Sequence, residues 1–161
     1  NESIFLDSST TVYEMAKHLA KMNSLMVATN DIMIAEALTD AEHLTVSVIG
    51  GTLRRHYFTL TGYFAEALLK DLCFDCSFLG IDSANLKGGL MITNIEEVQI
   101  KRKIVEVSDR VVVLCDHSKF EQASFLNICG FDHIDVVITG KELNDEIARK
   151  YIDAGVNLVR V

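Results

Sequence analysis

Short, almost wholly apolar runs alternate along this chain with segments in which apolar residues recur every three or four positions. The apolar runs are rich in Val, Ile and Leu, which is typical of strands that are buried on both faces of a sheet. We expect strands at Ser3–Asp7, Leu25–Thr29, Leu44–Ile49, Cys76–Ile81, Val111–Cys115, Asp135–Thr139 and Val156–Val161.

The segments between these runs have helical periodicity. The first of them brings four apolar residues onto one helical face, Val12, Met15, Ala16 and Leu19. Either Asn30 or Asp31 is placed to cap the second. We expect helices at Thr10–Met22, Asp31–Leu38, Tyr63–Leu72, Asn94–Ser108 and Asn144–Ala154. Strands that alternate with helices predict an open α/β fold, in which a mostly parallel sheet carries helices on both faces.

Three segments fall outside this alternation. Gly50 and Gly51 predict a turn after the third strand. Ser83–Ile92 has no readable period and is expected to be a glycine-bearing loop. Phe120–Cys129 has no clear period either, and forms either an antiparallel hairpin or an excursion at the edge of the sheet. No repeat, low-complexity stretch or Ser/Gly linker divides the chain, so we expect a single domain over residues 1–161.

Composition indicates a folded domain that does not itself bind nucleic acid. Of the 161 residues, 49% are apolar and 24% are charged, which excludes wholesale disorder and a disulfide-stapled mini-fold. The 15 Lys and Arg residues are outnumbered by 23 Asp and Glu residues, and the formal net charge is -8. A DNA duplex has to be met with Lys and Arg. No apolar run approaches the ~20 residues of a membrane span, and we expect no membrane contact and a cytoplasmic location.

The cysteines are expected to be free thiols that serve as small core residues. Cys73 and Cys76 form a C-x-x-C pair, whereas Cys115 and Cys129 stand alone in apolar surroundings. A zinc site needs a second pair of Cys or His ligands at similar spacing, and nothing in the chain supplies one. We therefore expect neither a metal nor a cofactor.

Polar residues follow five of the predicted strands. Ligands of open α/β sheets bind at the carboxyl ends of the strands, so these positions are the candidates for a site. Hydroxyls, carboxylates, amides and a few cations suit a small phosphorylated polyol better than a flat aromatic ring. The positions are Asp7–Thr11, Thr29–Asp31, Gly50–Arg55, Gly80–Ser83 and Asp116–Lys119.

The run of hydroxyl residues after the first strand has the clearest chemistry. Ser9, Thr10 and Thr11 place hydroxyls and free backbone N–H groups at a helix N-terminus, where an anion such as phosphate is favoured. The alternative is that Ser9 or Thr10 is only an N-cap. Lys119 could supply a cation to the same site, although a lysine after a strand is usually a solvated charge.

Taken together, six motifs in order along nearly the whole chain resemble the effector-binding domain of DeoR-type bacterial transcription regulators. The motifs are Asp7-x-Ser9-Thr10-Thr11, Thr29-Asn30, Gly50-Gly51-Thr52-Leu53-Arg54, Phe78-Leu79-Gly80-Ile81-Asp82, Glu97 with Lys101, and Asp116-x-Ser118-Lys119-Phe120.

The resemblance implies a fold shared with ribose-5-phosphate isomerase, glucosamine-6-phosphate deaminase and CoA transferase. It implies a phosphorylated sugar as effector, self-association into a dimer or tetramer through the apolar sheet edges, and most often a repressor of sugar-metabolism genes. Members carry a winged helix-turn-helix ahead of this domain, so we expect one before Asn1, and operator DNA as a partner of that segment only.

The resemblance also implies roles for individual residues. Ser9, Thr10 and Thr11 would form the phosphate loop with Lys119 as its cation, although family members usually have Gly at the position of Ser9. Asp82, Glu97 and Lys101 would line the sugar side. Gly50 and Gly51 would form a tight turn, and Arg54 after it would reach the ligand or a neighbouring subunit. The full expected ligand-binding set is Asp7, Ser9, Thr10, Thr11, Thr29, Asn30, Gly50, Gly51, Arg54, Asp82, Lys87, Glu97, Lys101 and Lys119. Glu97 and Lys101, four residues apart, could instead form a simple exposed helical pair.

The enzyme alternative is a sugar-phosphate isomerase or deaminase of the same fold group. Isomerases of that group carry an Asp-Gly-Ala-Asp string at the end of the fourth strand, where this chain has Leu79-Gly80-Ile81-Asp82. Leucine cannot transfer a proton, so the proton relay is broken while binding is still possible. His117 lies between Asp116 and Ser118, but consecutive residues point in different directions and do not make a triad. The sequence therefore favours an effector-binding domain over an enzyme.

Overall fold

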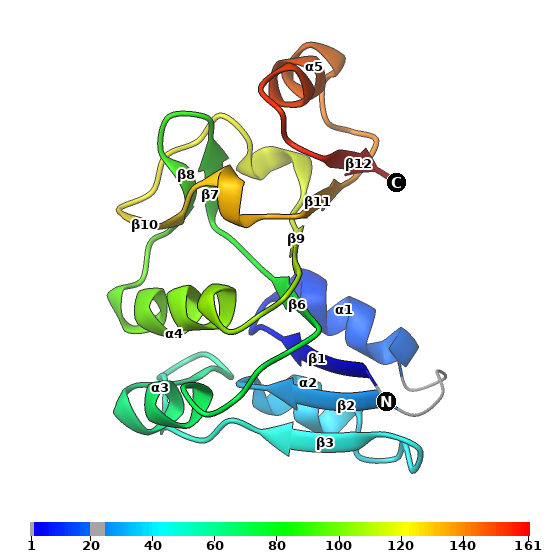
Figure 1. Ribbon diagram of the computed structural model, residues 1–161, viewed down its shortest axis with the longest axis vertical. Helices are drawn as coiled ribbons and strands as arrows, with labels where there is room; N and C mark the ends of the chain where they lie inside the picture. Colours follow the sequence, from blue (N-terminus) through cyan, green and yellow to red (C-terminus); the bar gives the residue numbers. More distant parts are fainter. Residues whose placement is uncertain (1, 20–24) are drawn as a thin grey trace.

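The computed structural model describes residues 2–19 and 25–161 (Figure 1). Its centre is a seven-stranded sheet in the order β12-β11-β9-β6-β1-β2-β3, with every neighbouring pair parallel. The strands of this sheet are β1 (Glu2–Leu6), β2 (Leu25–Thr29), β3 (Thr45–Val48), β6 (Cys76–Leu79), β9 (Val111–Leu114), β11 (Val136–Thr139) and β12 (Leu158–Arg160). The predicted parallel α/β sheet is confirmed.

Five helices and two short 3-10 turns accompany the strands in the described residues. They are α1 (Thr10–Leu19), α2 (Ile32–Ala37), α3 (Tyr63–Leu69), α4 (Ile95–Glu106) and α5 (Asp145–Asp153), with η1 (His117–Lys119) and η2 (Phe131–His133). The strands of the two smaller sheets are β4 (Thr52–Leu53), β5 (Leu60–Thr61), β7 (Ser83–Asn85), β8 (Gly89–Ile92) and β10 (Leu126–Cys129).

Alternate residues of the main strands face two separate cores. Ile4 and Leu6 of β1 pack on one side of the sheet with the buried faces of α1 and α2, whereas Phe5 packs on the other side with α3 and α4. The edge-on contact of the Phe5 ring with Phe74, at 5.3 Å between centroids, belongs to this second core. Because both faces of the sheet are covered, the strands show the continuous apolar runs seen in the sequence.

Most element predictions hold with ends displaced by a few residues. β2 has the predicted bounds, and the helix predicted for Tyr63–Leu72 ends at Leu69. Asp31 caps α2, since its Oδ1 accepts from the N–H groups of Met33 at 2.7 Å and Ile34 at 3.0 Å. For the helix predicted for Thr10–Met22, residues 20–22 lie outside the described residues.

The prediction of a loop over Ser83–Ile92 is wrong. This segment forms the antiparallel β7–β8 hairpin, and β10 adds to it antiparallel to make a second, three-stranded sheet. Of the two alternatives for Phe120–Cys129, the structure therefore shows an antiparallel strand, in a separate sheet rather than at the edge of the main one. Every residue of β8 is buried, so the hairpin lacks the alternation by which a strand is recognised.

Gly89 shows why this hairpin needs a glycine. Its φ is +73°, and a Cβ there would run into the carbonyl oxygen of Cys129 on β10. The unpredicted β4–β5 hairpin is shorter still, with two residues in each strand, and its connecting segment covers the ends of β1 and β2. None of the described helices is both long and apolar enough to cross a bilayer.

Candidate functional site

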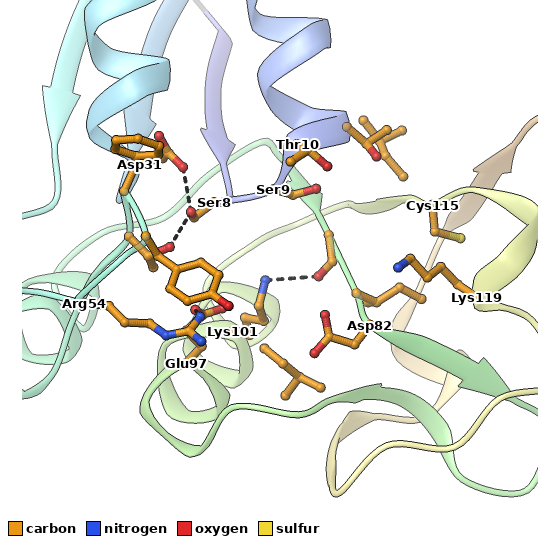
Figure 2. A pocket seen from close by; sticks show the side chains of 18 of the residues that line it. Ser8, Ser9, Thr10, Asp31, Arg54, Asp82, Glu97, Lys101, Cys115 and Lys119 are labelled. Atoms are coloured by element: carbon orange, nitrogen blue, oxygen red, sulfur yellow. Dashed lines mark hydrogen bonds and ion pairs between the residues drawn. The ribbon is translucent and has the colours of Figure 1, made fainter.

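The carboxyl ends of β1, β6 and β9 open into one pocket, which the β4–β5 hairpin and α4 close from the side (Figure 2). Its volume is about 400 Å³, and a second hollow of about 600 Å³ adjoins it and shares Arg54, Asp82, Glu97 and Lys119. This is the strand-end position at which ligands of open α/β sheets bind.

One end of the pocket is the N-terminus of α1. The helix begins at Thr10, and the carbonyl of Ser9 accepts from the N–H of Tyr13 at 2.8 Å. Ser9, Thr10 and Thr11 all line the pocket, so the hydroxyl-bearing run faces it together with the first-turn N–H groups that no helical carbonyl can satisfy. Ser9 sits at the N-cap position as well, and capping is therefore compatible with a place in the pocket.

Lys119 lines the same pocket as this helix end, and Figure 2 shows its amino group directed into the pocket. It is the last residue of η1, a turn that Asp116 starts by accepting from the N–H of Ser118 at 2.8 Å. Among the ion pairs of the described residues none involves Lys119. Its charge is therefore available to a ligand.

The floor of the pocket contains a buried ion pair between Lys101 and Asp7. Asp7 Oδ2 also accepts from the N–H of Gly80 at 2.9 Å, and the Lys101 amino group donates to the Gly80 carbonyl at 3.0 Å. Burial raises the pKa of the Asp7 carboxyl above its ordinary value, against the opposing effect of the Lys101 charge. Lys101 reaches the pocket, but a neighbouring carboxylate already offsets its charge.

The side wall is formed by Arg54 and Glu97, which pair with each other. The Arg54 guanidinium lies over the Tyr57 ring at 3.5 Å from its centroid, and its Nε is 3.9 Å from an oxygen of Glu96. Burial raises the pKa of Glu97, while Lys101 acts in the opposite direction. The alternative prediction, that Glu97 and Lys101 form an exposed helical pair, is therefore wrong. Both side chains are buried, and each pairs with a residue from another element.

A third polar group belongs to residues that were not in the expected set. Ser8 Oγ donates to Asp31 Oδ2 at 2.6 Å and lies 2.5 Å from Thr59 Oγ1 (Figure 2). Thr59 and its neighbours Tyr57 and Phe58 come from the β4–β5 connection and line the pocket. Ser8 and Asp31 belong to the strand-end positions that the sequence indicated but not to the expected binding set, whereas the connection over 54–59 carries no periodic signal.

The structure brings eight of the fourteen expected residues to the pocket wall and leaves the others elsewhere. Those on the wall are Ser9, Thr10, Thr11, Arg54, Asp82, Glu97, Lys101 and Lys119. Asp82 is oriented by Thr93, whose N–H donates to it at 2.7 Å.

The remaining expected residues support the pocket or lie apart from it. Asp7 is behind Lys101, and the Thr29 hydroxyl donates to the Leu6 carbonyl at 2.7 Å. The Asn30 amide donates to the Leu60 carbonyl at 3.2 Å and so holds the β4–β5 hairpin. Gly50 and Gly51 precede that hairpin, where a Cβ on Gly51 would meet the Thr61 carbonyl at 2.5 Å. The expectation that Lys87 reaches the site is not met, since Lys87 is exposed at the turn of the β7–β8 hairpin and lines a different hollow.

Within residues 2–19 and 25–161, no three His, Cys, Asp or Glu side chains are grouped so as to hold a metal ion. The C-x-x-C pair is split between an exposed Cys73 and a buried Cys76. Leu79, which the resemblance places where isomerases would carry an acid, is fully buried at the end of β6. The described pocket thus offers cations, hydroxyls and carboxylates for binding.

Comparison with protein families finds one match, to the DeoR C terminal sensor domain, over residues 1–141. Curated relatives of this chain include several that are named as transcriptional regulators. The putative aga operon transcriptional repressor of Escherichia coli O157:H7 is 33% identical over 158 residues, covering 98% of this chain and 59% of that protein. The HTH-type transcriptional repressor GlcR of Bacillus subtilis is 30% identical, covering 98% and 60%. The chain thus spans about 60% of the length of these relatives.

Solved structures share the fold at low sequence identity. Ribose 5 phosphate isomerase A from Neisseria gonorrhoeae has a TM-score of 0.51 and 17% identity, with 78% of this chain and 48% of that chain covered. eIF2B delta from Chaetomium thermophilum has a TM-score of 0.56 and 17% identity, with 85% and 48% covered. One fold thus carries an isomerase and a subunit of a different kind of protein, so the fold alone does not assign a function.

Proposed function

The chain belongs to the family of DeoR C-terminal sensor domains, and we propose that its strand-end pocket binds a phosphorylated sugar as effector. The observation that carries this proposal is the placement of Ser9, Thr10 and the α1 N-terminus in one pocket with Lys119. A phosphate between them would accept from hydroxyls and backbone N–H groups on one side and from an ammonium on the other.

The sugar would lie between this phosphate end and the side wall. Asp82 and Glu97 present carboxylate oxygens that accept hydrogen bonds from sugar hydroxyls, and Arg54 donates. The pocket volume of about 400 Å³ lies in the range of roughly 300–1,000 Å³ that small-molecule sites occupy.

In the whole protein the effector would control DNA binding by a segment ahead of this domain. Relatives are named as HTH-type regulators, and this acidic chain spans only 59% to 61% of their length. We propose that the whole protein is a regulator, most often a repressor in this family, and that copies of it associate. Ligand can alter DNA binding only if it binds one conformation or assembly better than another.

The enzyme alternative does not fit the comparisons. The family and its curated relatives are regulators, so the chain is a sensor domain rather than an enzyme. The buried Leu79 agrees with this assignment, since it removes an acid that the isomerases carry at the pocket.

A thermal-shift screen tests the proposal. The chain is melted with a panel of triose, pentose and hexose phosphates, each beside the same free sugar and beside inorganic phosphate. At least one sugar phosphate should raise the melting temperature in a concentration-dependent way, because a ligand that binds only the native state stabilises it. The matching free sugar should have little effect. A panel without any stabiliser, or equal stabilisation by free sugars, would contradict the proposal.

A further inference from the structure

Large apolar side chains are exposed on three elements that pack against one another, namely α3, the β4–β5 hairpin and the start of α4. We call this region the α3 surface, and it consists of Leu53, Tyr63, Phe64, Leu68 and Ile95. Tyr63 and Phe64 are 78% and 74% exposed, and their rings meet edge to face at 5.7 Å between centroids.

These side chains are not needed to attach α3 to the sheet. The inward face of the helix is formed by Ala65 and Leu69, which are fully buried in the core. Phe64 and Leu68, one helical turn apart, therefore point away from the core. The described contacts reveal no role in the fold for Tyr63 and Phe64, two solvent-exposed aromatic residues at the start of α3. Aromatic residues are enriched in protein interfaces.

The α3 surface is large enough for one half of an interface. With about 200 Å² for an aromatic side chain and somewhat less for Leu or Ile, the exposed fractions amount to roughly 600 Å² of apolar area. This is at the top of the roughly 300–600 Å² range for the largest patch of a monomer. A standard interface takes about 800 Å² from each partner, of which only a little over half is apolar.

We propose that the α3 surface binds a second copy of this chain. Two copies of a domain with net charge -8 repel each other wherever carboxylates face carboxylates, whereas the five side chains of this surface are all uncharged. An uncharged apolar patch is also complementary to itself, as an interface with two-fold symmetry requires. The inference rests on the self-association proposed above and gives it a location.

This location would join the interface to the effector pocket. Leu53 directly precedes Arg54, and Ile95 lies two residues before Glu97 in the first turn of α4. The Arg54–Glu97 pair forms the pocket wall, so the hairpin and helix that hold the pair also carry the α3 surface. A second copy would press on the same two elements that the ligand contacts.

The sequence indicated the apolar edges of the sheet as an interface, and a competing location is therefore the edge of the main sheet at β12. Ile152 of α5 is 52% exposed and Val161, just after β12, is 67% exposed. Figure 1 shows α5 and β12 at the opposite end of the molecule from α3. Substitutions at these two sites therefore provide a matched control, since they remove similar apolar area far from the α3 surface.

Sedimentation velocity over a range of protein concentrations tests the proposal. The parent chain, Tyr63→Ser/Phe64→Ser and Ile152→Ser/Val161→Ser are compared, and circular dichroism melting verifies that each is folded. We expect the parent and the control variant to associate with similar affinity. The Tyr63→Ser/Phe64→Ser variant should be monomeric, or should associate at least tenfold more weakly.

Each other result overturns the proposal in a recognisable way. A monomeric parent contradicts self-association itself. Dissociation by the control variant alone places the interface at the sheet edge, and parent-like association of Tyr63→Ser/Phe64→Ser places it off the α3 surface. If Tyr63→Ser/Phe64→Ser unfolds, Phe64→Glu alone repeats the test. The thermal shift with a stabilising sugar phosphate is measured on the same samples, so a failed interface is distinguished from a failed effector site.

Discussion

The side chain of Ser9 fills the space that a Cβ on Gly80 would need. A Cβ built on Gly80 would lie 2.5 Å from Ser9 Oγ and would overlap the Ser9 Cβ. Gly80 also holds the buried ion pair, through its N–H to Asp7 and its carbonyl to Lys101. Serine at the position where family members usually have Gly is thus accommodated by the absence of a side chain on the facing residue.

Gly80→Ala should therefore destabilise the domain, by about 1–3 kcal/mol, because an added methyl in a packed site forces the backbone or its neighbours to move. Ser9→Gly alone should cost less, and the double variant Ser9→Gly/Gly80→Ala should recover part of the loss. Urea unfolding of the four proteins gives the coupling energy between the two sites. Additive effects would show that the two residues do not compete for space.

Lys119→Ala should weaken binding of the stabilising sugar phosphate by about tenfold or more, since a charge-assisted hydrogen bond to phosphate contributes roughly 1.5–3 kcal/mol. Lys87→Ala is the matched control, because Lys87 is exposed and lies outside the pocket. Isothermal titration calorimetry measures both variants. Equal affinity of Lys119→Ala and the parent would remove Lys119 from the phosphate site.

Thr10→Val tests the opposite end of the same site. The substitution keeps the β-branched shape and removes one hydroxyl at the start of α1, so the fold should persist while the affinity for the sugar phosphate falls several-fold. Calorimetry with the free sugar beside it shows whether the loss belongs to the phosphate. A variant that binds like the parent would leave phosphate recognition to the backbone N–H groups and Lys119.

Lys101→Met should destabilise the domain by about 3–5 kcal/mol at neutral pH, because it leaves the Asp7 carboxylate buried without its cation. Burial already raises the pKa of Asp7, and removing Lys101 takes away the largest opposing effect. A carboxyl with a raised folded-state pKa contributes stability at low pH that is lost as the pH rises through that pKa. The loss in the variant should therefore be larger at pH 7.5 than at pH 5, as urea unfolding at the two values can measure. A loss that is the same at both pH values would contradict a raised pKa of Asp7 in the variant, because the carboxyl would then be ionised in both the folded and the unfolded state over this range.

The positions of the main strands along the chain and the location of the pocket at their carboxyl ends followed from the sequence, because each depends on local signals. Continuous Val and Ile runs mark strands such as Val111–Leu114. A polar residue directly after such a strand has to lie where the carboxyl ends of the strands meet. Asp116 and Lys119 were found in this way.

What the sequence missed depends on contacts between distant segments. Every residue of β8 is buried, so this strand shows no alternation. The side wall comes from the segment between β4 and β5, which Asn30 and Asp31 hold through Leu60 and Thr59. The partners of Lys101 and Glu97 were missed for the same reason. Asp7 is 94 positions from Lys101, and Arg54 is 43 positions from Glu97.

Thiol reactivity should distinguish the cysteine that lines the pocket from the exposed one. Burial, assisted by the nearby Asp116 charge, raises the pKa of Cys115 to about 12, so on the order of one thiol in ten thousand is ionised at pH 8. Burial likewise raises the pKa of Cys129 to about 11. Cys73 is exposed. Iodoacetamide at pH 8 should therefore alkylate Cys73 first and Cys115 far more slowly, as peptide mass spectrometry over time can measure.

The same reaction in urea should modify all four cysteines at comparable rates, because unfolding removes the burial that holds the pKa up. If Cys115 of the folded protein is alkylated as fast as Cys73, the part of the pocket around Cys115 opens to water more often than its packing indicates.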